Sequence, residues 1–191
     1  MTRHTLVLAS QSPRRKQLLE MLGLPILVQP SDVYEKPLPR ETPLAYSKRL
    51  AREKAQAGVG EFVLGADTIV VLDEHLLEKP ADDADALRML TLLQGRTHEV
   101  ITSVALVARG KLYEATDITK VTFRAADPEY LRAYIATGEP HDKAGAYGIQ
   151  GYGAALVERI EGDFFGVMGL PVRLVLRLMA EAGWAYRFGE G

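Results

Sequence analysis

Apolar and polar residues follow two patterns along the chain, and these predict strands and helices in alternation. Short apolar runs bounded by polar residues are typical of buried strands, whereas apolar residues spaced three or four apart are typical of amphipathic helices. The predicted strands span residues 5–9, 25–29, 62–72, 76–77, 97–108, 112–123 and 155–160. The predicted helices span residues 43–57, 83–93 and 171–182, with two more that begin at Pro13 and Pro128 and stop before Gly23 and Gly138.

Helix starts and turns agree with this pattern. Ser12 precedes Pro13, and Thr42 precedes Pro43. Each pair places a side chain that caps a helix before a proline at the first helical position. The dipeptide at 109–110, Arg-Gly, separates two long β-rich segments and predicts a hairpin. Because this hairpin interrupts the alternation of helices and strands, we expect an α/β protein with a mixed sheet flanked by helices.

The composition is that of a folded globular protein. Its 191 residues suit a single domain, 1–191, with room for two lobes that share a sheet. Hydrophobic residues make up 47% and charged residues 25%, which excludes a disordered chain. Lys and Arg total 23 against 25 Asp and Glu, so the net charge of -2 provides no general attraction for nucleic acid.

The same composition bears on location. The chain has no cysteine, which excludes disulfides and thiolate metal sites. The apolar stretch 62–72 contains Asp67, and the stretch 164–180 contains Pro171 and two arginines, so neither offers the roughly 20 uninterrupted apolar residues of a membrane span. The apolar run at 6–9 is too short for a signal peptide. We expect a cytoplasmic protein that does not bind membranes.

The first candidate for chemistry is the segment 10–15, Ser-Gln-Ser-Pro-Arg-Arg, where a strand passes into a helix. The free N–H groups and the dipole of a helix start attract anions. Arg14 and Arg15 in the first turn oppose that dipole unless an anion lies between them. A solvated basic turn next to an ordinary cap remains the alternative.

The second candidate is Asp67, which lies inside the most strand-like apolar run of the chain. An unpaired carboxylate in apolar surroundings is costly to bury, so this residue needs a cation, a metal or the mouth of a pocket. Perturbed carboxylates concentrate at functional sites. The alternative is a strand that ends or bulges at Gly65 and leaves the carboxylate exposed or in a salt bridge.

Several charged residues are candidate partners for Asp67. Lys54 and Arg52 lie on the helix before its strand, and Lys79 lies shortly after it. Asp32 and Glu35 lie in a polar loop. Loop oxygens together with one strand carboxylate suit Mg²⁺ or Mn²⁺, which prefer few carboxylates and substrate phosphates. Taken singly, each of these residues is more typical of a solvated surface charge, since Lys and Glu side chains are mostly exposed.

A glycine-rich segment at 143–153 forms the last candidate. Its glycines allow a backbone to approach a ligand closely. Gln150 offers an amide that donates and accepts hydrogen bonds, which matches the imide edge of uracil or thymine. Tyr147 and Tyr152 are candidates for stacking on a base. A turn whose tyrosines pack into the core is the alternative.

Several of these segments, in this order, resemble the Maf family of nucleotide pyrophosphatases over essentially the whole chain. The matching segments are 8–15 (Leu-Ala-Ser-Gln-Ser-Pro-Arg-Arg), 49–55 (Arg-Leu-Ala-Arg-Glu-Lys-Ala), 65–68 (Gly-Ala-Asp-Thr), 78–80 (Glu-Lys-Pro), 142–151 (Asp-Lys-Ala-Gly-Ala-Tyr-Gly-Ile-Gln-Gly) and 167–171 (Val-Met-Gly-Leu-Pro). The resemblance implies an elongated α/β fold of the Maf and inosine-triphosphatase type, with a central cleft. It also implies a homodimer, a divalent metal cofactor and hydrolysis of nucleoside triphosphates to the monophosphate and pyrophosphate.

The resemblance also implies roles for individual residues. The combination of Thr68 and Gln150, with Arg14, looks like the dTTP/UTP pyrophosphatase branch, whose function is to clean nucleotide pools of unwanted nucleotides. Asp67 would be the proton acceptor and would share a metal with Glu35. The remaining phosphate-site residues carried over from the family are Ser10, Arg15, Lys54 and Lys79.

Two other functions stay open from the sequence. One is a pyrophosphatase for modified purine nucleotides such as 7-methyl-GTP, in which a glutamate takes the place of Gln150. The other is a nucleotide-binding regulator of septum formation, which would need a nucleotide pocket but not Asp67. In each case we expect a small-molecule nucleoside triphosphate as the partner.

Overall fold

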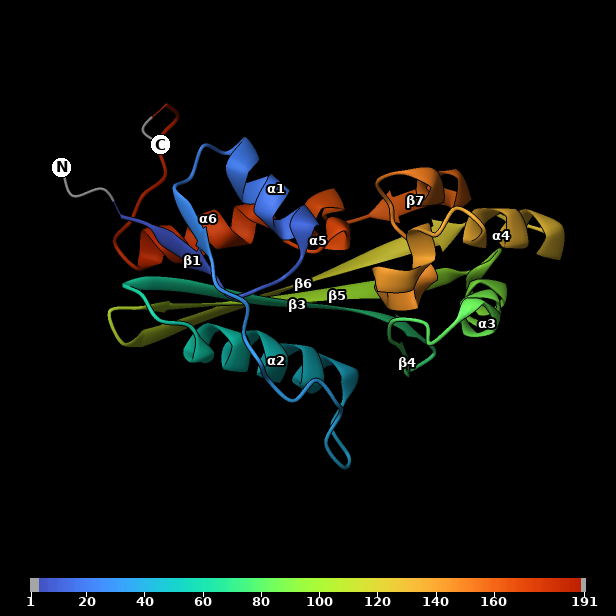
Figure 1. Ribbon diagram of the computed structural model, residues 1–191, viewed down its shortest axis with the longest axis horizontal. Helices are drawn as coiled ribbons and strands as arrows, with labels where there is room; N and C mark the ends of the chain where they lie inside the picture. The colour runs from blue at the N-terminus through green and yellow to red at the C-terminus, as the bar shows by residue number, and fades with distance from the viewer. Residues whose placement is uncertain (1–3, 190–191) are drawn as a thin grey trace. The chain divides into compact units, whose positions relative to one another are not determined.

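The computed structural model describes residues 4–189 (Figure 1). These residues form two compact units. Unit 1 contains the chain up to Asp67, Thr102–Asp117 and the chain from Gly169 onward. Unit 2 contains Thr68–Ile101 and Ile118–Met168. Among the described residues, no helix is both long and apolar enough to cross a membrane.

The strands of residues 4–189 form a seven-stranded sheet in the order β2-β1-β3-β5-β6-β7, with β4 paired to β3. Their bounds are β1 Leu6–Leu8, β2 Ile26–Val28, β3 Phe62–Leu72, β4 His75–Leu77, β5 Thr97–Ala108, β6 Lys111–Phe123 and β7 Val157–Glu161. β1 runs parallel to β2 and β3, whereas β4 is antiparallel to β3 and β7 is antiparallel to β6. The predicted mixed sheet is therefore confirmed.

Six α-helices accompany this sheet in the described part of the chain. They are α1 Pro13–Met21, α2 Pro43–Ala57, α3 Asp83–Leu93, α4 Pro128–Ile135, α5 Phe164–Met168 and α6 Val172–Glu181. The side chains of Ser12, Thr42 and Asp127 each accept the backbone N–H three residues ahead, and a proline follows each of them. These starts lie where the sequence predicts them, because capping depends only on neighbouring residues.

The sequence prediction is wrong in two places, both in unit 2. The last strand begins at Val157 and not at residue 155, because the 3₁₀ turn η3, Tyr152–Leu156, occupies the preceding residues. The helix α5 was not predicted. It is too short for an apolar period, and Asp163 caps it by accepting the N–H groups of Phe165 and Gly166.

In unit 1, α2 lies directly against β3 (Figure 1). A Cβ atom added at Gly65 would stand 2.2 Å from the carbonyl oxygen of Ala51 and 2.4 Å from the amide nitrogen of Ala55. The helix backbone thus takes the space that a side chain on the strand would need. The methyl groups of Ala51, Ala55 and Ala105 form a small buried cluster at this contact. Small residues here are what allow the helix to approach the strand closely.

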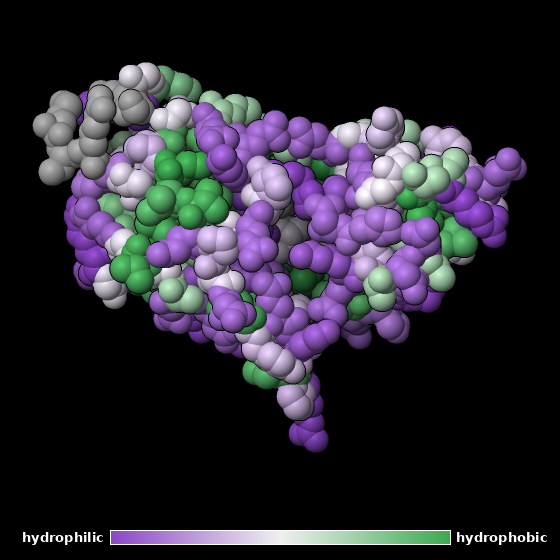
Figure 2. Space-filling model, viewed as in Figure 1, coloured by the Kyte–Doolittle hydropathy of each residue, from purple (hydrophilic) through white to green (hydrophobic). Residues whose placement is uncertain are grey.

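β2 forms one edge of the sheet and is less buried than its neighbour. All three residues of β1 are buried, whereas Leu27 and Val28 on β2 are exposed. Figure 2 shows apolar side chains gathered over this part of unit 1 on the face in view. The core of the unit therefore lies at β1 and β3 and not at β2.

Candidate active site

Asp67 and Lys54 form a buried ion pair in unit 1. The Lys54 Nζ atom lies 3.0 Å from Asp67 Oδ1 and 3.0 Å from Glu35 Oε1. The side chains of Lys54 and Asp67 are only 8% and 9% exposed, whereas that of Glu35 is 50% exposed. One ammonium group therefore joins a buried carboxylate to a carboxylate that solvent reaches. This pairing is what permits Asp67 to lie inside an apolar strand, since an unpaired buried carboxylate is costly.

The second oxygen of Asp67 has no such partner. Asp67 Oδ2 is buried, and no hydrogen-bond donor among residues 4–189 reaches it. A buried polar atom without a partner is rare in folded proteins and needs an explanation. An oxygen acceptor held in place by the Lys54 contact at Oδ1 is suited to a water molecule or a hard cation.

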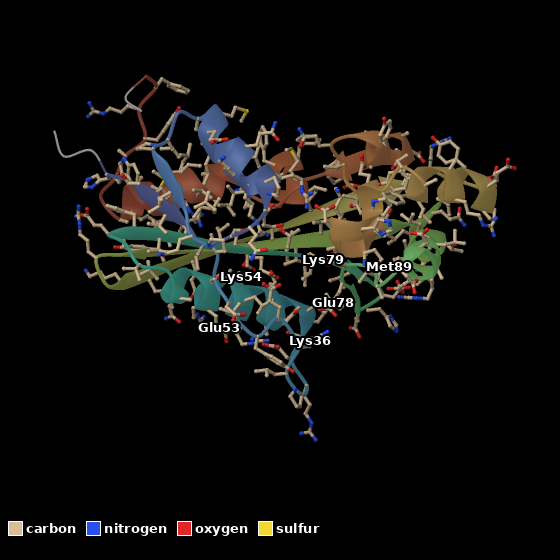
Figure 3. All side chains as sticks on the ribbon, in the orientation of Figure 1. Lys36, Glu53, Lys54, Glu78, Lys79 and Met89 are labelled. Atoms are coloured by element: carbon tan, nitrogen blue, oxygen red, sulfur yellow. The ribbon has the colours of Figure 1, made fainter. Side chains whose placement is uncertain are left out.

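The close contact of α2 with β3 positions this pair. Lys54 lies on the last turn of α2, and it reaches Asp67 because Gly65 lets the helix approach the strand. Figure 3 labels Lys54 on α2. The buried hydroxyl of Ser47, two turns earlier on α2, lies 3.4 Å from the carbonyl oxygen of Asp67 and 3.0 Å from the Ser103 hydroxyl. Ser47 thus holds the strand at Asp67, a role that nothing in its local sequence indicates.

The helix start at α1 holds Arg15 in one orientation. The Arg15 Nε atom donates to the carbonyl oxygen of Gly169 at 2.8 Å, and Nη1 donates to Ser10 Oγ at 3.0 Å. Ser10 Oγ also accepts the backbone N–H of Ser12 at 3.2 Å. Arg15 is buried, so the solvated basic turn considered above does not describe this residue. The sequence did not indicate Gly169, since it lies 154 residues further along the chain.

Electrostatic coupling connects Arg15 with the carboxylates. Burial lowers the pKa of Arg15, and neighbouring Arg14 lowers it further, whereas Asp67 and Glu35 act to raise it. The guanidinium therefore lies within the electrostatic reach of both carboxylates that Lys54 joins. The structure thus brings five of the predicted site residues into one cluster of unit 1: Ser10, Arg15, Glu35, Lys54 and Asp67.

The other four predicted site residues are half-buried or exposed. Arg14 is half-buried next to Arg15 in unit 1. Three belong to unit 2: Thr68 is half-buried on β3, Lys79 is exposed after β4, and Gln150 is exposed between two 3₁₀ turns. Figure 3 labels Lys79 on the segment that follows β4. The preceding residue, Glu78, accepts the N–H of Gly145 at 3.1 Å through its carbonyl oxygen, which ties this segment to the glycine-rich one.

The two tyrosines of the glycine-rich segment differ in burial. Tyr147 was a candidate for stacking on a base, but it is buried, and its hydroxyl lies 2.8 Å from His98 Nε2. Its ring packs edge-on against Phe123, and burial lowers the pKa of His98 to about 4. Tyr147 is therefore a core residue, whereas Tyr152 remains 70% exposed and available to stack.

The two carboxylates of the cluster are suited to a hard divalent cation. Among residues 4–189, no group of three or more His, Asp or Glu side chains is arranged to hold a metal ion. Glu35 and Asp67 meet at Lys54, and Asp67 Oδ2 offers a buried oxygen. Mg²⁺ is commonly held by one or two carboxylates, with water and substrate phosphates as its other ligands. Of the two loop carboxylates, Glu35 is the one in contact with Lys54.

The described residues thus form an α/β protein with a mixed sheet. A lysine-bound carboxylate of that sheet lies within electrostatic reach of an arginine at the start of a helix. The chain belongs to the Maf family, because the family model described as "Maf-like protein" matches residues 5–182.

Curated relatives support this assignment over nearly the full length. The chain is 50% identical over 182 residues to a protein of Koribacter versatilis, and the matched region covers 93% of this chain and 94% of that protein. It is 52% identical over 184 residues to a protein of Moorella thermoacetica, and the matched region covers 93% of this chain and 95% of that protein. Each of these relatives is named dTTP/UTP pyrophosphatase.

Proposed function

We propose that this protein hydrolyses dTTP and UTP to the nucleoside monophosphate and pyrophosphate. The observation that carries the proposal is the buried Asp67, whose Oδ1 is held by Lys54 while Oδ2 remains without a donor among the described residues. Such a carboxylate has one oxygen fixed and one ready to accept a proton. The names of the relatives supply the substrates.

In the proposed reaction, Asp67 Oδ2 accepts a proton from a water molecule as the water oxygen attacks the α-phosphorus. A bond forms between the water oxygen and the α-phosphorus, and the bond from that phosphorus to the oxygen that bridges the α- and β-phosphates breaks. The electron pair of the broken bond leaves with pyrophosphate. Lys54 balances the buried negative charge of Asp67 and fixes the position of Oδ1.

Cationic residues would stabilise the charge that develops on the departing pyrophosphate. Ser10 and Gly169 fix the guanidinium of Arg15 in place, so the group does not have to reorient when the charge develops. Arg14 and Lys79 would add further positive charge. A divalent cation, Mg²⁺ or Mn²⁺, held by Glu35 and Asp67, would supply additional neutralisation of the phosphates.

The first test is to identify the products. The purified protein, incubated with Mg²⁺ or Mn²⁺ and a panel of nucleoside triphosphates, is expected to release pyrophosphate and the monophosphate, with the highest kcat/KM for dTTP and UTP. Stepwise release of orthophosphate would contradict attack at the α-phosphorus. Preference for 7-methyl-GTP would support the purine alternative, and binding without hydrolysis would support a regulatory protein.

A second prediction concerns Gln150, which with Thr68 and Arg14 would determine the nucleobase. Gln150→Glu is expected to lower kcat/KM for dTTP and UTP about tenfold, because a carboxylate cannot donate a hydrogen bond to the base carbonyl O4. The measurement is kcat/KM across several nucleotides. Gln56→Glu makes the same substitution at an exposed position on α2. It is the matched control and should leave kcat/KM unchanged for every nucleotide. Equal relative kcat/KM in the Gln150 variant and the wild type would reject this role.

The proposal also includes a homodimer in the cytoplasm, where its nucleotide substrates occur. Light scattering after size-exclusion chromatography measures the mass of the assembly. A mass of 21.0 kDa, that of one chain, would contradict the dimer.

A further inference from the structure

The carboxylate of Glu139 anchors the segment that carries Gln150. Glu139 begins the 3₁₀ turn η1, Glu139–Asp142, in unit 2. Its Oε2 accepts the backbone N–H of Tyr152 at 2.8 Å, and its Oε1 accepts the backbone N–H of Gly153 at 2.8 Å. These two amides follow Gln150 by two and three residues. Hydrogen bonds from backbone amides to a carboxylate are charge-assisted and stronger than neutral ones.

Tyr134 completes the anchor on the other side of Gln150. The Tyr134 hydroxyl donates to Glu139 Oε1 at 2.9 Å and accepts the backbone N–H of Gly148 at 3.1 Å. Burial raises the pKa of Tyr134, and Glu139 raises it further, so the hydroxyl keeps the proton that it donates. The chain is therefore held two residues before Gln150 and again two and three residues after it.

The glycines of this segment are explained by the same contacts. Gly151 has φ +106°, and a Cβ atom there would lie 2.5 Å from Glu139 Oε2. A Cβ atom at Gly153 would lie 2.3 Å from the carbonyl oxygen of Gly148 and 2.8 Å from the Tyr134 hydroxyl. The sequence suggested that these glycines make room for a ligand. At 151 and 153, they make room for the anchoring side chains.

The anchored backbone leaves one side chain exposed. Ile149 is buried, whereas the next residue, Gln150, is exposed. A side chain on a backbone fixed at both ends has fewer conformations to lose when it binds a base, and such preorganisation increases affinity. This arrangement is what a residue that reads one edge of a base requires.

We propose that Glu139, together with Tyr134, is a positioning residue for nucleobase selectivity, which acts by holding the backbone on both sides of Gln150. This inference rests on the proposed function and on the role of Gln150 in it. Glu139 acts only through the segment that it anchors, so its loss should affect recognition of the base and not recognition of the phosphates.

The test uses Glu139→Gln in the full-length protein. The glutamine amide retains one oxygen acceptor but turns an NH₂ group toward the other backbone N–H, so at least one anchoring bond is lost. We expect the KM for dTTP and UTP to rise about tenfold, with kcat within about twofold of wild type. The inhibition constant of inorganic tripolyphosphate, which has no base, should not change. Hydrogen exchange at residues 148–153 should be faster.

Two further variants sharpen the test. Glu129→Gln neutralises an exposed carboxylate in the first turn of α4 and is the matched control, with no change expected in any of these measurements. Tyr134→Phe removes the hydroxyl but retains the carboxylate of Glu139, and it should shift KM and hydrogen exchange in the same direction. If Glu139→Gln does not fold, the same measurements on Tyr134→Phe test the inference.

Unchanged KM values in the Glu139 variant, with or without faster exchange, would overturn the inference while the proposed function stands. An equal loss of kcat and of tripolyphosphate binding would also overturn it, since that result indicates general loss of structure. A wild-type protein that hydrolyses neither dTTP nor UTP would contradict the proposed function, and this inference with it.

Discussion

Asp67→Asn is expected to lower kcat for dTTP and UTP by about 100- to 10,000-fold while nucleotide binding is retained, because general-base catalysis typically contributes that much. An amide is a very poor proton acceptor, but its oxygen can still accept a hydrogen bond from Lys54. The asparagine side chain has nearly the same shape as that of Asp67, so the site should remain intact. Steady-state kinetics measure the loss, and isothermal titration with dTTP measures the binding.

Asp67→Asn also removes the buried one of the two carboxylates that pair with Lys54 and leaves only the half-exposed Glu35. Because breaking a buried pair is destabilising by about 3–5 kcal/mol, the kinetic result needs a control for stability. Thermal unfolding of the variant, with and without nucleotide, separates loss of structure from loss of chemistry. Glu114→Gln removes a carboxylate that pairs with Arg52 on the same helix as Lys54, at a more exposed position, and should retain wild-type kcat. If a folded Asp67→Asn protein turned over substrate at the wild-type rate, the proposed base would be wrong.

Gly65→Ala is expected to lower the free energy of unfolding by about 3 kcal/mol or more and to abolish activity. The added methyl group would lie 2.2 Å and 2.4 Å from backbone atoms of α2, which cannot move aside as a flexible side chain can. The helix would have to shift away from β3, and Lys54 would move away from Asp67. Denaturant unfolding measures the change in stability, and dTTP hydrolysis measures the loss of the site.

The matched control for this prediction is Gly110→Ala. Gly110 lies in the β5–β6 turn with φ +78°, and a Cβ atom there would meet nothing within 4 Å. Its cost should be limited to the left-handed backbone, about 1–2 kcal/mol, and activity should remain. If both glycine variants lost the same stability, or if Gly65→Ala retained activity, close contact between α2 and β3 would not be what positions Lys54.

The sequence predicted the elements well where short-range physics decides them. The start of α2 at Pro43 follows from its cap at Thr42, and β3 follows from an apolar run of eleven residues. Asp67 was recognisable because a carboxylate inside such a run needs a partner. The short helix α5 and the 3₁₀ turn η3 were missed, since neither is long enough to show a period.

The candidate site could be predicted only in part. Lys54, Arg52 and Lys79 were equally good partners for Asp67 in the sequence, and only packing distinguishes among them. Arg52 pairs with Glu114 at 2.9 Å, whereas Lys54 lies 3.0 Å from Asp67. Arg52 and Lys54 both lie on α2, and the packing of the helix against β3 decides which of them faces the strand. The role of Tyr147 in the core was undecidable for the same reason.

By itself, the sequence determined the succession of helices and strands, the capped start of α1 with its two arginines and the isolated acid within β3. These features depend on residues that are close together along the chain. The tertiary structure alone decided that Lys54 joins Asp67 to Glu35, that Gly169 and Ser10 orient Arg15, and that Glu139 anchors the segment carrying Gln150. Each of these contacts depends on the packing of elements distant in sequence or on the path of an irregular loop, and no local pattern encodes either.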